Sequence, residues 1–416
     1  MWRSALIVMA ACLLSMSASG ARADVTVREQ GVTVPEEQRV TGGPEGWRAT
    51  PRYRVHKAAP APGGVRPEFI TGQGYTPSQI IAAYGISGTG AGQTVAIVDA
   101  CGSSSIAADL AAFSSAYGLP PATLNIIPIS GQYNDCQPGS ANAVGWGFET
   151  SLDVEWVHAL APDATIDLVV PPSDYFSDLF TAVYYAGHTL HAQVVSMSWG
   201  GPEFSSEKYS DYVFESPGTV FLAASGDSGS GAQYPATSPY VVAVGGTSLY
   251  LSNGAGTLKF PEVAWEDSGG GPSQFEAKPR YQTAFGIPGA TRRSIPDVAF
   301  AADPYTGVLV YDSNYDPSSG NLWIAGGTSL SAQCWAAIIA LADQGRAAAH
   351  LAPLTDGHNA LYELAVSRKR YNAYGLYRDI TWGYNGNYAA ARGYDFVTGL
   401  GSPIAGSLIP NLAVWQ

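Results

Sequence analysis

The stretch GGTSLSA at residues 326–332 sets a serine between a predicted strand and a predicted helix. The run LWIA at 322–325 is short and apolar, as a buried strand is, and AQCWAAIIALA at 332–342 combines strong helix formers with apolar residues on every face. Gly326 and Gly327 allow the backbone to turn sharply between the two. We therefore expect Ser329 in the first turn of a buried helix.

Two roles are open for Ser329. The first turn of a helix has unpaired backbone N–H groups and the positive end of the helix dipole, which favour an anion. A nucleophile that forms a tetrahedral oxyanion would be stabilised there. Thr and Ser at this position are also ordinary helix caps, so the motif alone does not decide between catalysis and capping.

The composition describes a large, well-buried and loop-rich globular protein. Of 416 residues, 46% are hydrophobic and 13% charged, and 48 are glycine. From Glu68 onward, 12 lysines and arginines stand against 29 aspartates and glutamates. We therefore expect no nucleic-acid partner. An acidic surface would also keep the protein soluble in a medium that partly protonates its carboxyl groups.

Residues 1–23 have the pattern of a signal peptide. Arg3 precedes the apolar run Ala5–Leu14, and Ala21-Arg22-Ala23 forms an A-x-A cleavage site. We expect a secreted, extracellular protein. No continuous apolar stretch is long enough to span a bilayer, so no membrane partner is expected.

The remaining chain divides into two parts. Residues 24–67 contain 7 lysines and arginines and many prolines and glycines, without sustained periodicity, which indicates a short pro-segment or linker. From residue 68 to 416, apolar runs alternate with helical patterns. This predicts an α/β fold with a mostly parallel sheet and helices on both faces. The predicted strands are 94–99, 165–170, 194–198, 220–224 and 240–244, and the predicted helices include 105–117 and 175–186.

Polar residues follow several of these strands, at the edge of the sheet where α/β proteins place their sites. They are Asp99, Ser198 to Gly201, Ser225 to Gly229, and Gly327 to Ser329.

A catalytic serine needs a general base, which is most often histidine. The six histidines offer no well-placed candidate: His56 lies in the linker, and His158, flanked by apolar residues, is predicted to be packed or solvent-facing. Glu149 and Asp153, four residues apart, share one face of a predicted helix. On a surface they would be a like-charge pair. In a cleft they would share a proton, and they could accept the serine proton at acidic pH.

Asp227 follows the predicted strand 220–224 in the turn SGDSG, where a subtilisin-like enzyme places an oxyanion-hole amide. A carboxyl group can donate a hydrogen bond to an oxyanion only while it is protonated, so this role also implies acidic pH. An Asx-turn is the alternative for this glycine-rich sequence.

The motifs Glu-x-x-x-Asp, Ser-Gly-Asp and Gly-Thr-Ser, in this order, resemble the sedolisin family of serine-carboxyl peptidases. The resemblance covers nearly all of residues 70–416, and further matching stretches are 75–77, 93–99, 161–164, 196–200, 234–247 and 296–303. It implies a subtilisin-like fold and an acid-acting endopeptidase of protein or peptide substrates, which we expect to be a monomer. By position, Ser329 would be the nucleophile, Glu149 the base, Asp153 its partner and Asp227 the oxyanion-hole residue.

The same resemblance implies one structural calcium ion near the carboxyl end of the chain. Two carboxylates and three backbone carbonyls, completed by water, make the all-oxygen shell that calcium prefers. The alternative is a plain glycine- and tyrosine-rich loop. The ligands would be Asp379, Ile380, Ala391, Gly393 and Asp395.

Three departures from the family pattern stand out. Gln333 replaces the usual proline four residues after the serine, and we expect it to touch no catalytic group. Ala391 stands where glycine is common, and the segment ahead of the domain is far shorter than the usual folded pro-domain. Two alternatives to an active sedolisin are a subtilisin-type Ser-His-Asp protease, which lacks a placed histidine, and a catalytically inactive sedolisin-like secreted binding protein.

Three cysteines remain after the predicted signal peptide. Cys101 and Cys136 could close one disulfide, contributing roughly 3–4 kcal/mol in the chain-entropy model. Cys334 lies in the apolar helix after Ser329 and is predicted to be a buried free thiol.

Overall fold

The computed structural model describes residues 25–40, 43–44, 46–57, 74–129, 141–252, 256–287, 289–318, 320–367, 370–371 and 375–416. The predicted signal peptide and Cys136 lie outside these ranges. Among the described residues, no helix has both the length and the apolar character needed to cross a bilayer.

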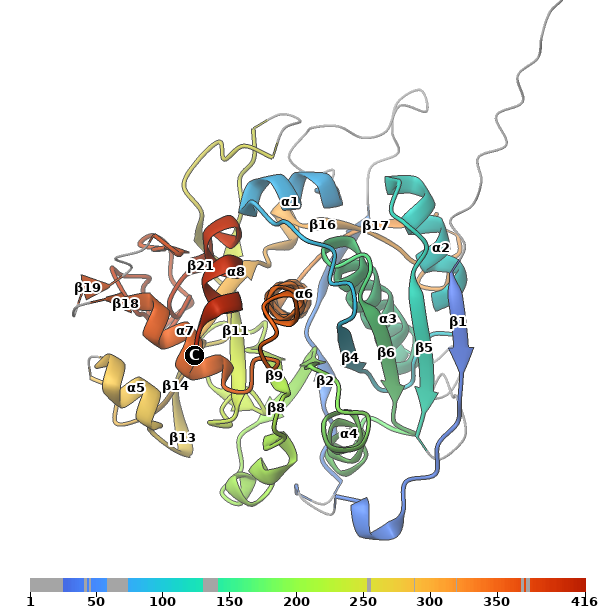
Figure 1. Ribbon diagram of the computed structural model, residues 1–416, viewed down its shortest axis with the longest axis horizontal. Helices are drawn as coiled ribbons and strands as arrows, with labels where there is room; N and C mark the ends of the chain where they lie inside the picture. Colours follow the sequence, from blue (N-terminus) through green and yellow to red (C-terminus); the bar gives the residue numbers. More distant parts are fainter. Residues whose placement is uncertain are drawn as a thin grey trace, which may run out of the picture.

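A mostly parallel sheet forms the centre of the described structure (Figure 1). Its order is β1-β5-β6-β4-β7-β9-β11-β12, with β15 also paired to β11. Every pairing is parallel except that of β11 with β12. The predicted fold class is therefore confirmed. The strands are β1 (Thr26–Glu29), β4 (Thr94–Val98), β5 (Thr123–Pro128), β6 (Thr165–Val170), β7 (Val194–Met197), β9 (Val220–Ala224), β11 (Val241–Ser248), β12 (Val263–Ala264) and β15 (Val298–Ala301).

Helices cover both faces of this sheet because successive side chains of a strand point to opposite sides. In β4, Val95 and Ile97 belong to one buried cluster, and Ala96 and Val98 belong to the other. The second cluster is covered by α4 (Phe176–Tyr184) and the π-helix Tyr185–Thr189. The first cluster includes residues of α1 (Pro77–Tyr84), α2 (Ile106–Tyr117), α3 (Ala141–Leu160), α6 (Thr328–Ala348), α7 (Gly357–Ala365) and α8 (Ala405–Val414).

The described residues of the N-terminal segment, 25–40, 43–44 and 46–57, belong to the folded body. Its strand β1 extends the edge of the central sheet through β5. Further along, β2 (Thr50–Pro51) pairs antiparallel with β8 (Trp199–Pro202), and β3 (Arg54–Lys57) pairs antiparallel with β17 (Leu322–Gly326). The segment predicted as a linker is therefore held by three strand pairings.

Smaller ladders complete the described structure. β10 (Gln233–Tyr234) pairs with β8, β16 (Val308–Tyr311) with β17, and β13 (Gly271–Ala277) with β14 (Arg292–Ile295). Near the carboxyl end, β18 (Val366–Ser367) pairs with β19 (Arg370–Tyr371), and β20 (Tyr377–Arg378) with β21 (Ser402–Pro403).

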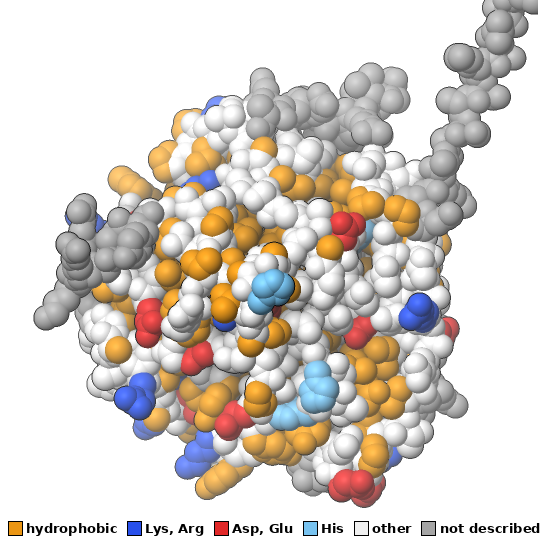
Figure 2. Space-filling view, in the orientation of Figure 1, with side chains coloured by type: hydrophobic (Ala, Val, Ile, Leu, Met, Phe, Trp, Pro, Cys, Tyr) orange, Lys and Arg blue, Asp and Glu red, His pale blue; other side chains and the backbone are white. Residues whose placement is uncertain are grey.

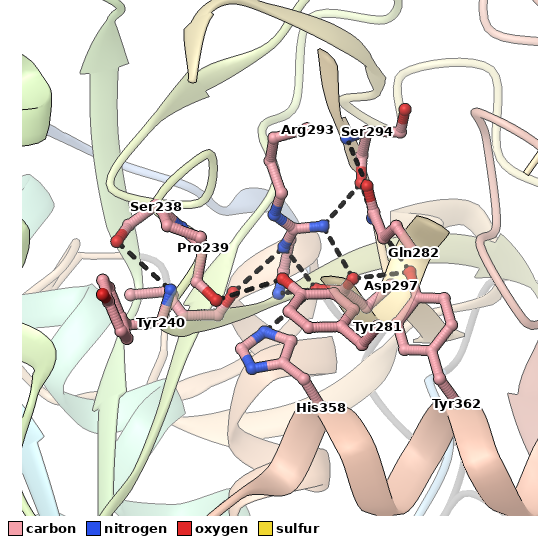
Figure 3. Close-up of polar contacts among 12 residues, drawn as sticks. Ser238, Pro239, Tyr240, Tyr281, Gln282, Arg293, Ser294, Asp297, His358 and Tyr362 are labelled. Carbon is pink, nitrogen blue, oxygen red and sulfur yellow. Dashed lines mark hydrogen bonds and ion pairs between the residues drawn. The ribbon is translucent and has the colours of Figure 1, made fainter. Parts of the chain in front are cut away.

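A buried ion pair ties β14 to the helices beside it (Figure 3). The Arg293 guanidinium donates two hydrogen bonds to the Asp297 carboxylate, at 2.7 and 2.6 Å, and both side chains are fully buried. The Tyr362 hydroxyl of α7 donates to the same carboxylate at 2.8 Å, and His358 Nε2 lies 3.6 Å from it. Burial would raise the pKa of Asp297, but the charge of Arg293, the nearby imidazole of His358 and the hydrogen bonds from Arg293 lower it below its ordinary value. We call these residues the Asp297 cluster.

On the face seen in Figure 2, lysine and arginine side chains lie in separate groups and do not form one continuous patch. The expectation that nucleic acid is not a partner stays a prediction.

Candidate active site

Ser329 lies in the first turn of α6, as predicted. Helix α6 begins at Thr328, and Gly327 before it has a φ of 114°, a conformation that side chains rarely adopt. Ser329 is fully buried, and its backbone N–H donates to the carbonyl oxygen of Arg52 at 3.0 Å. This helix N–H therefore faces a peptide carbonyl.

Glu149 and Asp153 lie one turn apart on α3 and are both fully buried. Ser329 and Asp153 lie close enough to Glu149 to affect its pKa, and Glu149 Oε2 accepts from the backbone N–H of Arg52 at 3.1 Å. The Ser329 hydroxyl itself donates to the carbonyl oxygen of Ser198 at 3.4 Å. The pair is therefore in a buried site beside the serine. The reading as a surface like-charge pair is wrong.

Burial raises the pKa of Glu149 and of Asp153 well above their ordinary values, and the charge of Asp99 raises both further. Asp99 is fully buried just after β4, and burial raises its own pKa to about 7. The sequence placed Asp99 among the polar residues at strand ends without giving it a role. The site thus contains three interacting carboxyl groups.

Asp227 lies in the turn after β9 and faces the start of α6. Its Oδ1 accepts hydrogen bonds from Thr328 N and Thr328 Oγ1, both at 2.8 Å, so its carboxyl group bonds across to the helix and not within an Asx-turn. Within the described residues Oδ2 has no hydrogen-bond partner. A Cβ atom on Gly327 would lie 2.7 Å from this Oδ2 and 2.3 Å from the carbonyl oxygen of Arg52. Both oxygens are therefore close to the side of Gly327 where a larger residue would place its side chain.

The pKa of Asp227 is raised to about 6. Burial is the main cause, and the hydrogen bonds from Thr328 and the charges of Arg52 and Arg54 oppose it. Below that pH the group holds a proton that it can donate.

Gln333 contacts the base system, and the expectation that it touches no catalytic group is wrong. Its Nε2 donates to Asp153 Oδ2 and, at 2.9 Å, to Ser198 Oγ. The cause is helix geometry, because residue 333 is four positions after Ser329 and therefore lies on the same face of α6. The spacing alone could have revealed this contact.

His158 is packed inside the fold. It is fully buried on α3, its Nε2 lies 3.1 Å from the carbonyl oxygen of Pro120, and burial lowers its pKa to about 4. Among the hydrogen bonds found in the described residues, none joins a histidine to Ser329.

The carboxyl-terminal loop gathers the residues that were predicted to bind calcium. Asp379 Oδ1 accepts from the backbone N–H of Gly393 at 2.9 Å, and Asp395 Oδ2 accepts from that of Ala391 at 3.1 Å. Asp395 is buried with only 4% exposure, and no ion pair to it is found in the described part of the chain. Within that part, the carbonyls of Ile380, Ala391 and Gly393 accept no backbone hydrogen bond outside helices and strands. This all-oxygen donor set fits calcium.

The structure tests one of the two predictions about the cysteines. Cys334 is free and buried in α6, as predicted. Cys101 is buried just after β4, with a φ of 64°, but Cys136 lies outside the described residues. The pairing of Cys101 with Cys136 therefore stays a prediction.

Comparisons with known proteins identify the class to which this site belongs. The model of the subtilase family matches residues 137–361. Kumamolisin of Bacillus sp. (strain MN-32) is 33% identical over 408 residues, which cover 88% of this chain and 68% of kumamolisin. Sedolisin of Pseudomonas sp. (strain 101) is 30% identical over 378 residues, covering 80% of this chain and 60% of sedolisin. The chain therefore belongs to the sedolisin family of subtilisin-like fold and is a serine-type peptidase.

A solved structure agrees with this assignment. Pseudomonas sedolisin, described as a serine-carboxyl proteinase complexed with two molecules of pseudo-iodotyrostatin, superposes with a TM-score of 0.66 at 28% sequence identity. The match covers 81% of this chain and 97% of that chain. Proteins or peptides are accordingly its substrates.

Proposed function

We propose that the protein is a secreted endopeptidase that acts in acid and cleaves peptide bonds through an acyl-enzyme on Ser329. Ser329 Oγ attacks the scissile carbonyl carbon while Glu149 accepts the hydroxyl proton. Asp153 and Asp99 share the proton with Glu149, because buried carboxyl groups this close cannot all ionise. The same proton then passes to the leaving amine, and water hydrolyses the acyl-enzyme.

The oxyanion of this mechanism would be held by two donors, Ser329 N–H and the protonated carboxyl of Asp227. One observation carries the proposal: the peptide carbonyl of Arg52 accepts from Ser329 N–H, and its oxygen and Asp227 Oδ2 both lie within 3 Å of the position that a Cβ atom on Gly327 would occupy. Among the described residues, this Oδ2 has no hydrogen-bond partner. Such an arrangement stabilises negative charge on a carbonyl oxygen next to the serine hydroxyl.

In this proposal, activity at acidic pH follows from the burial of the active-site carboxyl groups. The raised pKa of Asp227 keeps its carboxyl group protonated under mildly acidic conditions, so that it can donate to the oxyanion. Glu149 must be ionised to accept the serine proton, so activity also requires that the coupled carboxyl groups of Glu149, Asp153 and Asp99 have lost a proton. Histidine-based proteases instead need a neutral imidazole. Secretion is supported by the charge, apolar run and A-x-A site within residues 1–23.

The test is digestion of casein at about pH 4 by the wild-type protein and by Ser329→Ala. We expect the substitution to reduce turnover by several powers of ten, as loss of a nucleophile does. His158→Ala is the control and should keep most of the activity if it folds. A wild-type protein that binds casein without cleaving it would instead support the inactive binding protein.

We also propose one structural calcium ion on Asp379 and Asp395 with the carbonyls of Ile380, Ala391 and Gly393. An ion that binds only the folded chain raises its stability by mass action. Chelator at neutral pH should therefore lower the melting temperature of the wild-type protein, and Asp395→Ala should abolish that sensitivity. A melting curve that chelator leaves unchanged would contradict the proposal.

A further inference from the structure

A second cavity lies at the opposite edge of the central sheet from Ser329. Its volume is about 700 Å³, and it is lined by Val220 and Val242, near the amino ends of β9 and β11. Asp227 follows the carboxyl end of β9, so the length of that strand separates the cavity from the active site. A cavity of this volume is in the range of small-molecule sites.

One wall of the cavity is tied to the buried Asp297 cluster. Tyr281 of α5 (Arg280–Phe285) and His358 of α7 both line the cavity, and their rings stack with centroids 4.6 Å apart and planes 16° apart (Figure 3). The Tyr281 hydroxyl donates to the carbonyl oxygen of Pro239 at 3.1 Å, and His358 Nε2 lies 3.6 Å from the Asp297 carboxylate. These contacts hold the wall in place without a ligand.

Glu276 of β13 supplies a carboxyl group to the cavity. It lines the cavity, and only 4% of its surface is exposed. In the part of the chain that the structure describes, its Oε1 is buried without a hydrogen-bond partner, and no ion pair engages this residue. A buried acceptor without a donor is unfavourable. A ligand that brings donors to Glu276 would therefore be stabilised.

The other charged groups of the cavity favour a cation over an anion. The Lys278 ammonium already donates to two backbone carbonyls, at 3.2 and 3.1 Å, and Arg280 is exposed. Helix α7 begins at the cavity, but Asp356 caps it by accepting from the backbone N–H of Asn359 at 3.0 Å. Its positive end therefore already faces a carboxylate of the chain. The carboxyl oxygen of Glu276 still needs a donor.

Tyr240 gives the cavity a flat aromatic surface. It lines the cavity with 44% of its surface exposed, and the exposed carboxyl group of Glu215 lies close enough to raise its pKa. A guanidinium is planar, donates within its plane to a carboxylate and stacks its face on an aromatic ring. An ammonium ion has no such face. The pairing of a carboxyl group with a tyrosine ring therefore fits a guanidinium best.

From these contacts we infer that the cavity lined by Glu276, Tyr240 and His358 binds a small organic compound that carries a guanidinium group. The guanidinium donates to the Glu276 carboxylate and stacks on the ring of Tyr240. This ligand site is separate from Ser329 and does not depend on the proposed function.

Binding should depend on pH through Glu276. Its pKa is raised to about 7, mainly by burial and then by the charges of Asp211 and Glu203. Below that pH the carboxyl group holds a proton that the cation must displace, so affinity should rise about tenfold between about pH 6 and about pH 8. The charged groups that face Glu276 from the elements around it are Glu203, Glu207, Lys208, Asp211 and Arg293.

The first experiment titrates the full-length protein at about pH 8 with four probes in a calorimeter. They are n-butylguanidinium, its neutral isostere n-butylurea, n-butylammonium and inorganic phosphate. We expect n-butylguanidinium to bind about tenfold or more tightly than n-butylurea, because hydrogen bonds between charged groups are strong, and more tightly than n-butylammonium. Equal binding of n-butylurea, equal binding of n-butylammonium, or binding of phosphate alone would overturn the inference.

The second experiment locates the site with variants. Glu276→Gln keeps the shape of the side chain and should weaken n-butylguanidinium binding by about tenfold or more and abolish its pH dependence. Glu29→Gln is the matched control, since Glu29 is exposed on β1, and should bind as the wild type does. A pH dependence that persists in Glu276→Gln would assign it to His358 and overturn the role of Glu276.

Tyr240→Leu keeps the inference falsifiable if Glu276→Gln does not fold, because the exposed position of Tyr240 tolerates the change. It should weaken n-butylguanidinium binding by about threefold or more and leave the melting temperature of the unliganded protein unchanged. Unchanged affinity in Tyr240→Leu would overturn the inference. Casein digestion is expected to be the same in all three variants, so failure of this inference leaves the proposed function intact.

Discussion

Two buried carboxyl clusters in this fold have opposite pKa directions. In the Asp297 cluster, the guanidinium of Arg293 lowers the pKa of Asp297 against the effect of burial. In the active site, burial raises the pKa of Glu149 and Asp153, and no ion pair with either is found among the described residues. Burial alone therefore does not decide ionisation. A buried cation makes a fixed structural charge, whereas its absence leaves a proton available for transfer.

The largest expected effect is the loss of activity when Glu149, the proposed base in the active-site cluster, is replaced. Glu149→Gln keeps the shape of the side chain but cannot accept a proton from Ser329. We expect kcat/KM at about pH 4 to fall by several powers of ten, up to about 10⁶, because the serine and its base act as one unit. The melting temperature should not fall, because the substitution removes a buried ionisable group without a counter-ion. Turnover within tenfold of the wild type would show that Glu149 is not the base.

The next largest effect is on stability and belongs to the Asp297 cluster. Arg293→Met leaves the Asp297 carboxylate buried without its cation, which costs about 3–5 kcal/mol of folding free energy. Denaturant unfolding at pH 7 measures this loss. Arg39→Met is the control, because its ion pair with Glu36 is exposed and should contribute less than about 1 kcal/mol. Equal losses in the two variants would contradict the distinction between the clusters.

A smaller effect is expected on the pH dependence of stability. The pKa of Asp99 is about 7 in the folded protein, and that of an unperturbed aspartate is about 4. The folded state therefore holds a proton that the unfolded state releases. The contribution of this group to stability is full below about pH 4 and falls as the pH rises toward about 7, by up to about 4 kcal/mol at about 1.4 kcal/mol per pKa unit.

Thermal unfolding at pH 4 and pH 7 checks the sign of this dependence. The wild-type protein should melt at a lower temperature at pH 7, and Asp99→Asn should reduce the difference. A wild-type protein that is more stable at pH 7, with the same calcium concentration, would contradict the assignment of raised pKa values to the site.

The sequence predicted the parts of this fold in which apolar residues form a continuous run or recur at regular spacing. Strands β6 and β9 have the expected ends, and the helix after Ser329 forms with the serine in its first turn. Strand β5 was not predicted, because Asn125 interrupts its apolar run. Strand β1 has four exposed residues, so no apolar alternation marks it. Both strands exist through pairing with neighbours that are distant in sequence.

The site was predictable where residues share one element, and less so where they meet across elements. The spacing of Glu149 and Asp153 placed both on one helix face, and the same argument applied to Gln333 would have found its contact with Asp153. Asp99 joins the cluster only because β4 lies beside α3 in space. The path of Thr50 to Tyr53 through the active site depends on strand pairing that no local pattern records.

The pH dependence of kcat/KM for casein-derived peptides, measured for the wild type and for Asp227→Asn, tests the carboxyl mechanism most directly. Because the pKa of Asp227 is about 6 and the group donates only when protonated, activity should peak at about pH 3–5 and be small by about pH 7. Asparagine is a permanent donor, so the alkaline limb should move to higher pH in Asp227→Asn even if the maximum rate falls. A wild-type optimum near about pH 8, as a histidine or lysine base would give, or an alkaline limb that Asp227→Asn leaves in place, would contradict the account.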